Sequence, residues 1–277
     1  MMRTINAKII QEKVAELCIK ANTSLRCDCY EALELALSQE ISPRAKRLIK
    51  QIIENADIAY FEKIAICQDT GMPIIFLEIG QEIHIKGNLK DAINKGVAEG
   101  YIKGNLRNSI IKDPLKRSTS GFGPAVIHQE LVRGSKVKIT VLPKGFGCEN
   151  KSRLKMFNPT ASLKEIKEFI IESVKLAGPD ACPPYVVGIG IGGTADYASL
   201  LAKKALLKKV NGSQSIVHGL ENELLNSINK LNIGPMGLGG KTTALAVNIQ
   251  TYPTHIAGLP VAVNIGCHAL RSATAIL

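Results

Sequence analysis

The 277-residue sequence contains no tryptophan, and aromatic residues make up only 4% of it. A chain so poor in aromatic side chains offers no platform on which the bases of single-stranded nucleic acid could stack. No apolar run approaches the roughly 20 residues that a transmembrane helix needs. The N-terminal residues are interrupted by charges and lack the apolar core of a secretory signal peptide. We therefore expect a cytoplasmic protein without a membrane or nucleic-acid partner.

Acidic residues are scarce relative to basic ones: 24 Asp and Glu stand against 35 Lys and Arg, which gives a formal net charge of +11. The lysines are spread along expected helices, as at Lys164, Lys167 and Lys175, and this is typical of a solvated face. A positive field of this kind favours a small dianionic substrate or an acidic partner subunit.

The sequence has no C-x-x-C pair, and its seven cysteines are odd in number. A disulfide framework is therefore not expected in a chain from a reducing compartment. The close pair Cys27 and Cys29 lacks the spacing and the second pair of a zinc ribbon. Cys18 falls on the apolar stripe of an expected helix, where a cysteine packs as a small hydrophobic residue.

Periodicity predicts an α+β fold in which a helical N-terminal portion precedes a mixed α/β unit. We find no repeat and no low-complexity linker, so we expect one domain over residues 1–277, with 1–60 as its helical subregion. Expected helices cover 6–21, 30–38, a segment from Pro43 onward, 162–178 with a capping box at Ser162 and Glu165, 197–209 with a stop at Asn211-Gly212, and 220–231. Expected strands cover 74–79, 82–86, 125–131, 137–142, 185–191, 244–249 and 261–265.

Two glycine-rich stretches resemble nucleotide-binding loops but depart from the motifs. G-I-G-I-G-G (188–193) fits G-x-G-x-x-G, yet no acidic residue follows at the distance where a dinucleotide fold binds the ribose. G-P-M-G-L-G-G-K-T-T (234–243) has Pro235 where a phosphate loop needs its first glycine. Either stretch could still bind an anion through exposed backbone N–H groups.

The stretch I-C-Q-D-T-G-M-P (66–73) places a thiol, an amide, a carboxylate and a hydroxyl side by side. It follows one apolar run and precedes another, so one explanation is a turn in which Asp69 and Thr70 cap backbone groups and Gly71 takes a positive φ. The alternative is a reactive site, and the local sequence alone leaves both open.

Five blocks of the sequence decide between them: 66–71, G-F-G-C-E-N-K-S-R-L (145–154), D-A-C-P-P-Y (180–185), I-G-G-T-A-D (191–196) and N-I-G-C-H-A-L (264–270). In this order they resemble the iron–sulfur-dependent fumarate hydratases. The resemblance is greater to the α-subunit of the two-subunit form, shared with L(+)-tartrate dehydratase, and it runs from about residue 5 to the C-terminus.

The resemblance implies a [4Fe–4S] cluster with Cys67, Cys182 and Cys267 as its protein ligands. Thiolates are the usual ligands of such clusters. Three of them leave one iron open, and that iron can act as a Lewis acid toward a substrate. For each cysteine taken singly, the commoner role is that of a buried structural residue.

The resemblance also assigns substrate-binding residues: Gln68, Asp69, Arg107 and Gly147. Arg107 lies in N-L-R-N-S-I-I (105–111), and a guanidinium group can bind a carboxylate through two parallel hydrogen bonds. Asp69 is the candidate catalytic residue, as the proton carrier for a departing or attacking hydroxyl. Gly147 would contact the substrate through its backbone.

Two cysteine-adjacent positions stay open. Cys148 stands where the family usually has a small residue such as Ser, and we expect it to pack rather than to bind the cluster. His268 follows Cys267 and could be a base, but we expect it to support a ligand through a hydrogen bond.

The chain ends soon after Cys267, whereas single-chain members of the family continue into a domain that carries further carboxylate-binding arginines. We therefore expect a separate β-subunit, in an α₂β₂ assembly. The expected reaction is reversible hydration of fumarate to (S)-malate. The alternatives are an L(+)-tartrate dehydratase α-subunit and a non-catalytic basic binding protein of the same fold.

Overall fold

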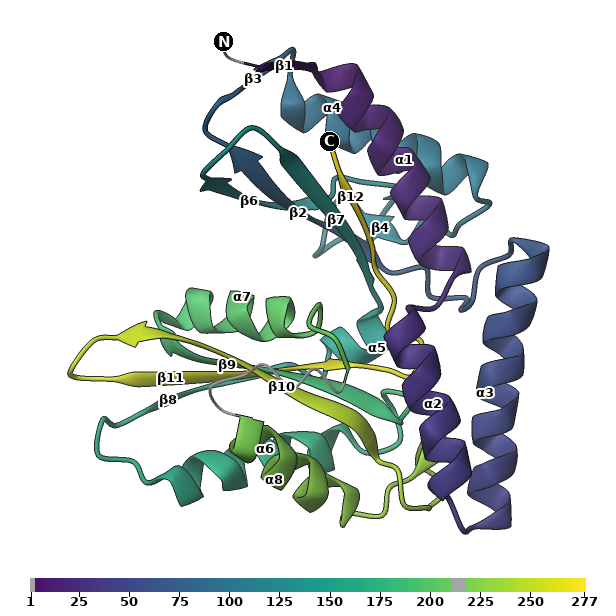
Figure 1. Cartoon of the computed structure of the whole chain (residues 1–277), viewed down its shortest axis with the longest axis vertical. Coiled ribbons are helices and arrows are strands. Elements are labelled where there is room, and N and C mark those ends of the chain that lie inside the picture. Colours follow the sequence, from purple (N-terminus) through teal and green to yellow (C-terminus); the bar gives the residue numbers. More distant parts are fainter. Residues whose placement is uncertain (1–2, 211–217) are drawn as a thin grey trace. The chain divides into compact units, whose positions relative to one another are not determined.

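The computed structural model describes residues 3–210 and 218–277, and these fold into two compact units (Figure 1). Unit 1 contains the segment that ends at Arg26, together with Asn55–Phe146 and Arg271–Leu277. Unit 2 contains Cys27–Glu54 and Gly147–Leu270. Each unit combines helices with a mixed sheet, which confirms the predicted α+β class.

Unit 1 is built on a four-stranded sheet of order β12-β7-β2-β6. Strand β2 (Met72–Gly80) runs parallel to β6 (Val126–Val132) and antiparallel to β7 (Val137–Lys144), which also pairs with β12 (Ala273–Ile276). Helices α1 (Ala7–Thr23) and α4 (Leu89–Lys103) lie against each other and share one apolar cluster with β2 and β7 (Figure 1). Two-stranded ladders join β1 (Arg3–Asn6) to β3 (Ile83–Lys86), and β4 (Ile110–Ile111) to β5 (Ser120–Gly121).

Unit 2 is built on a second four-stranded sheet, of order β10-β9-β11-β8. Strand β9 (Tyr185–Gly193) lies between β10 (Ala244–Thr254), to which it is parallel, and β11 (Leu259–Gly266), to which it is antiparallel; β8 (Arg153–Phe157) forms an edge. Helix α7 (Ala195–Ala205) covers one face, and α6 (Leu163–Ala177) and α8 (His218–Asn229) cover the other (Figure 1).

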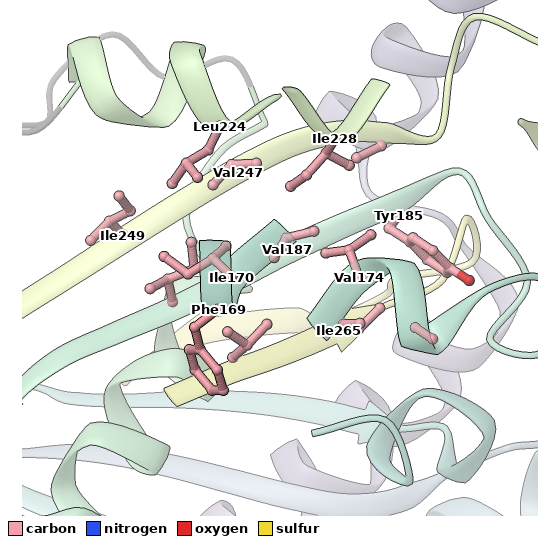
Figure 2. Packing of buried hydrophobic residues seen from close by; sticks show 14 of the residues in the cluster. Phe169, Ile170, Val174, Tyr185, Val187, Leu224, Ile228, Val247, Ile249 and Ile265 are labelled. Atoms are coloured by element: carbon pink, nitrogen blue, oxygen red, sulfur yellow. The ribbon is translucent and has the colours of Figure 1, made fainter. Parts of the chain in front are cut away.

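Alternation along β9 explains how one strand serves both faces. Val187 and Ile189 belong to the apolar cluster formed with α6 and α8. Figure 2 shows Val187 together with Ile170 and Leu224 in this cluster. Gly188 and Gly190 face α7 instead: a Cβ atom at either would lie within 2.2 Å of a backbone oxygen of that helix. The G-I-G-I-G-G stretch is therefore strand rather than loop, and its glycines let α7 approach the sheet closely.

The N-terminal portion is helical, as predicted. Helix α1 begins directly after Asn6, whose side chain caps it, and α2 (Cys27–Gln39) and α3 (Pro43–Glu62) follow. The capping box at Ser162 and Glu165 is present at the start of α6. The stop signal at 211–212 lies outside the described residues. Of the helices described, none is both long and apolar enough to cross a membrane.

Several elements were not predicted: β1, β4, β5, β8, β12, α4, the short helix α5 (Phe146–Glu149) and a 3₁₀ turn at Pro235–Gly237. The predicted strands all exist, and most extend one to five residues beyond the expected ends. The helix expected over 197–209 begins and ends earlier, as α7.

Candidate active site

A pocket of about 440 Å³ in unit 1 brings together two of the predicted substrate residues, Asp69 and Arg107. Asp69 lies in the loop before β2, and Arg107 lies between α4 and β4. Phe146, at the start of α5, also lines the pocket. Two residues 38 positions apart in sequence therefore face one cavity, as the resemblance required of a shared substrate site.

The Asp69 carboxylate is held by two backbone groups. Its Oδ1 atom accepts from the N–H of Gly71 at 3.0 Å, and its Oδ2 atom accepts from the N–H of Phe146 at 2.7 Å. The first bond makes the turn that local sequence predicted, and the second fixes the carboxylate beside α5. The turn explanation of this stretch is therefore confirmed, and the site explanation, which is compatible with it, stays a prediction.

Buried side chains hold the loop of Asp69 from beneath. The Tyr101 hydroxyl donates to the carbonyls of Thr70 at 2.8 Å and Gly71 at 3.2 Å. Burial raises the pKa of Tyr101, so the phenol keeps the proton that it donates. The Thr70 hydroxyl donates to the carbonyl of Arg107 at 3.1 Å, and this bond ties the two pocket segments together.

Sequence reasoning missed a second support, Arg271. Its side chain is buried, and it donates to the carbonyl of Asp69 and, through Nε, to Asn22 Oδ1 at 3.2 Å. Asn22 in turn accepts at its carbonyl from Ile66 N at 2.9 Å. The only signal for Arg271 in the sequence was its position, directly after the block that ends at Leu270.

Cys182 and Cys267 lie next to each other in unit 2. The backbone N–H of His268 donates to the carbonyl of Cys182 at 3.2 Å, and the Nδ1 atom of His268 lies 3.1 Å from the same oxygen. The supporting hydrogen bond expected of His268 is therefore present, with Nδ1 as the protonated nitrogen. Cys67 belongs to unit 1, half-buried at a bend after α3, so unit 2 alone brings together two of the three predicted ligands.

Cys182 has φ +56°, a left-handed backbone conformation. Residues other than glycine adopt it at a cost, and such residues cluster at functional sites. A glycine would relieve the cost but would remove the thiol. The retained cysteine therefore supports a role for its sulfur.

Exposure separates the predicted ligands from the other cysteines. Cys67, Cys182 and Cys267 are each partly accessible, whereas Cys18, Cys29 and Cys148 are buried and Cys27 is exposed. Burial raises the pKa of Cys18 to about 12. A hydrogen bond and the charge of Glu31 raise the pKa of Cys27, so neither thiol is a ready thiolate.

Cys148 packs, as expected. Its side chain is buried in the apolar cluster of unit 2, and its Sγ donates to the carbonyl of Ala181 at 3.3 Å. The neighbouring Tyr185 donates to the carbonyl of Gly178. Position 148 thus supports the turn that carries Cys182 rather than presenting a fourth ligand.

The donor set fits an iron–sulfur cluster in kind. Three partly accessible thiols, two of them adjacent, are the ligands that such a cluster takes. Within 3–210 and 218–277, no three side chains of His, Cys, Asp or Glu form a group that could hold a single metal ion. The assignment of the three cysteines as ligands stays a prediction.

Two other predicted substrate residues do not line the pocket. Gln68 is exposed, next to Asp69. Gly147 is exposed and belongs to unit 2, where a Cβ atom would meet nothing closer than 3.9 Å. Packing within unit 2 therefore does not require glycine at this position, and the role of both residues stays a prediction.

The second glycine-rich stretch, 234–243, binds a carboxylate of the same chain, that of Glu40. The buried Glu40 carboxylate accepts from the N–H groups of Ile41 at 2.8 Å, Ser42 at 3.0 Å and Lys241 at 2.8 Å. Burial alone would raise the pKa of Glu40, but these bonds and one from Thr242 outweigh burial and lower it. The loop is thus filled by a carboxylate rather than open to a phosphate.

Comparison with known proteins agrees with this arrangement. The model of the family described as fumarate hydratase (Fumerase) matches residues 11–276. The match covers nearly the whole chain, and the chain therefore belongs to this family.

The relatives found are named as subunits. A protein of Methanocaldococcus jannaschii named "Putative L(+)-tartrate dehydratase subunit alpha" is 42% identical over 274 residues, which cover 95% of this chain and 96% of the relative. The L(+)-tartrate dehydratase subunit alpha of Escherichia coli O157:H7 is 28% identical over 271 residues, 96% of this chain and 89% of the relative. The corresponding protein of E. coli strain K12 is 27% identical over the same shares.

Proposed function

We propose that this chain is the α-subunit of a hydro-lyase that removes water from L(+)-tartrate. The observation that carries the proposal is the pocket that Asp69 and Arg107 share. The names of the relatives favour tartrate over fumarate. We therefore replace fumarate, the substrate first expected, by the alternative, L(+)-tartrate. Fumarate hydration stays the second candidate, because the family description names it.

In the proposed reaction, Arg107 binds one carboxylate of the diacid through its guanidinium group. A base that the β-subunit would supply takes a proton from the carbon beside a carboxylate, and the hydroxyl on the neighbouring carbon departs as water after taking up a proton. Asp69 is the proton carrier for that hydroxyl, and its bonds from Gly71 and Phe146 keep the carboxylate in place. The product of tartrate is the enol of a 2-oxo diacid.

Cys67, Cys182 and Cys267 would hold a [4Fe–4S] cluster. When bound, it would supply a Lewis acid at the iron that lacks a protein ligand. His268 holds the carbonyl of Cys182, and Cys148 holds that of Ala181, so both position the ligand loop. Gln68 and the backbone of Gly147 are the remaining substrate contacts that we propose.

We further propose that a separate β-subunit completes the site, in an α₂β₂ assembly, and that both units of this chain act as one cluster-binding domain. The "subunit alpha" in the names of the relatives supports the partner. A cytoplasmic location suits free thiols and a cluster that air would inactivate.

The decisive experiment measures turnover of L(+)-tartrate, fumarate and (S)-malate by the complex purified anaerobically with its partner. We expect tartrate to have the highest kcat/KM. If fumarate had the highest kcat/KM instead, the result would favour the second candidate, fumarate hydration. Turnover of none of the three would overturn the hydro-lyase proposal and favour a binding protein of the same fold.

The cluster is tested on the chain itself, by anaerobic loading with iron and sulfide and by visible absorption. Single Ser variants at Cys67, Cys182 and Cys267 should each lose the cluster absorption. The matched controls should keep it: they are Cys27→Ser and Cys148→Ser, and in the second the introduced hydroxyl can donate to the carbonyl of Ala181 in place of the thiol. A parent protein that stays colourless, or three variants that load as the controls do, would contradict the assignment.

A further inference from the structure

A second arginine, Arg117, lines the pocket of Asp69 and Arg107. It lies in the connection between β4 and β5, which Lys112 N closes by donating to Thr119 O at 3.1 Å. Within this connection, Asp113 accepts from Arg117 N at its carbonyl, at 2.8 Å. The same aspartate accepts at Oδ1 from the backbone N–H groups of Leu115 and Lys116. The turn that carries Arg117 is therefore internally bonded.

Arg117 has φ +50°, so it occupies the left-handed region that favours glycine. The turn would form with less strain around a glycine, as at Cys182. The cost is tolerated where a side chain is needed at that point, and here the side chain reaches the pocket.

Neither guanidinium group in the pocket forms an ion pair with a residue that the structure describes. Within 3–210 and 218–277, the side chains of Arg107 and Arg117 make no ion pair and no hydrogen bond. Asp69 lines the same pocket, but its oxygens accept from Gly71 and Phe146 instead. A concave surface with two unpaired cations is suited to a ligand with more than one negative charge.

The hydroxyl of Ser109 points to the same conclusion. Ser109 lines the pocket, and its Oγ atom is shielded from solvent without a hydrogen-bond partner among the described residues. Buried hydroxyl groups are nearly always satisfied, so one without a partner calls for a group that is not part of the chain. An oxygen of a bound ligand would supply it.

From these observations we infer that Arg117 binds the second carboxylate of the substrate while Arg107 binds the first, with the Ser109 hydroxyl as an additional donor. The inference rests on the proposed function, because it takes the ligand to be a small diacid. It assigns to this chain the selection of dicarboxylates over monocarboxylates.

The test compares two inhibitors of the anaerobic complex that differ by one carboxylate, succinate and butyrate. In Arg117→Gln we expect the inhibition constant of succinate to rise about 10- to 100-fold, as for loss of a charge-assisted hydrogen bond. The constant of butyrate should change little. Arg117→Lys should recover part of the preference for succinate, because it keeps the charge without the planar fork.

Lys116→Gln is the matched control, since it removes one positive charge from the same turn without touching the pocket. It should leave both inhibition constants near those of the parent. Equal weakening of succinate and butyrate in Arg117→Gln would mean a structural role, and unchanged constants would mean no role; either result overturns the inference.

The parent complex separates this inference from the proposed function. If the parent does not bind succinate more tightly than butyrate and turns over no hydroxy diacid, the proposed function itself fails. If the parent prefers succinate and Arg117→Gln keeps that preference, the function stands and the role of Arg117 alone is wrong.

Discussion

At the scale of single residues, the backbone conformation of Cys182 is itself evidence that its side chain has a role. Its left-handed conformation costs about 1–2 kcal/mol for a residue with a Cβ atom. We predict that Cys182→Gly unfolds at a higher temperature than Cys182→Ala, measured on the cluster-free chain. Both variants should fail to take up iron and sulfide. If the alanine variant proved as stable as the glycine variant, the strain at this position would be refuted.

Tyr101 provides a second test at the scale of one residue. Its hydroxyl is the donor to two carbonyls of the loop that carries Asp69. Tyr101→Phe leaves these buried carbonyls without their donor, so we predict a loss of roughly 1–3 kcal/mol in the free energy of unfolding. Urea unfolding measures it.

Tyr60 is the matched control, because it is 51% exposed. Tyr60→Phe should change the free energy of unfolding by less than about 0.5 kcal/mol, as for most surface substitutions. A loss of the same size in both variants would show that the Tyr101 hydroxyl has no special part in holding the loop.

At the scale of elements, the sequence predicted the helices and strands that have a clear residue pattern of their own. The capped helix α6 and the buried strands β2, β7, β9 and β11 have strong periodicity or dense β-branched residues. The edge strand β8 was missed because most of its side chains are exposed, so it has no buried face to mark it.

Helix α4 was missed for a different reason. It contains Gly96 and Gly100, and glycine disfavours a helix interior. A Cβ atom at these positions would lie 2.4 Å from Gln11 O and 2.6 Å from Ala15 O of α1. The glycines thus permit a close helix pair, and this benefit depends on a partner about 85 residues away that local reading does not see.

The loop 234–243 supports a prediction about pH. The lowered pKa of Glu40 means that its ionised form stabilises unit 2 above about pH 4.5, the ordinary glutamate value. That stabilisation is lost as the pH falls through the lower pKa that Glu40 has in the folded state. We predict that Glu40→Gln lowers the free energy of unfolding by roughly 1–3 kcal/mol at neutral pH. The difference from the parent should shrink in acid.

Exposed Glu34, on α2, is the control for this change. Glu34→Gln should follow the stability curve of the parent at every pH, as measured by urea unfolding. A Glu40→Gln difference that stayed constant from neutral pH to below pH 4 would contradict the assigned titration.

At the scale of the whole molecule, the candidate site could be predicted only in part. Residues of short blocks gave Asp69 and Arg107, which the structure places at one pocket. Ser109 lies within the block 105–111, but only the structure shows that its hydroxyl is shielded and without a partner among the described residues. Arg117 and Arg271 were not found, because no motif marks the turn of the first or the residues before β12 that contain the second. Nor does residue order show that Cys67 belongs to one unit and Cys182 and Cys267 to the other.

The net charge of +11 also acts at this scale. A positive field attracts a dianionic substrate, and salt screens it as the Debye length falls from about 30 Å at 0.01 M to about 3 Å at 1 M. We predict that the KM for the diacid rises several-fold over this range while kcat changes little. A neutral osmolyte at matched osmolality is the control, and a KM independent of salt would refute the prediction.

The alternation of the two units along the chain has a consequence for synthesis. Every segment of unit 2 lies before residue 271. Unit 1 also needs Arg271–Leu277, because this segment supplies the Arg271 side chain and the strand β12, which pairs with β7. On the ribosome, the unit that starts first is therefore finished last. Until residues 271–277 have emerged, the edge of β7 is unpaired and the loop of Asp69 lacks the support of Arg271, so both are open to chaperones. A nascent chain that lacks residues 271–277 would be cut by protease in unit 1 before unit 2.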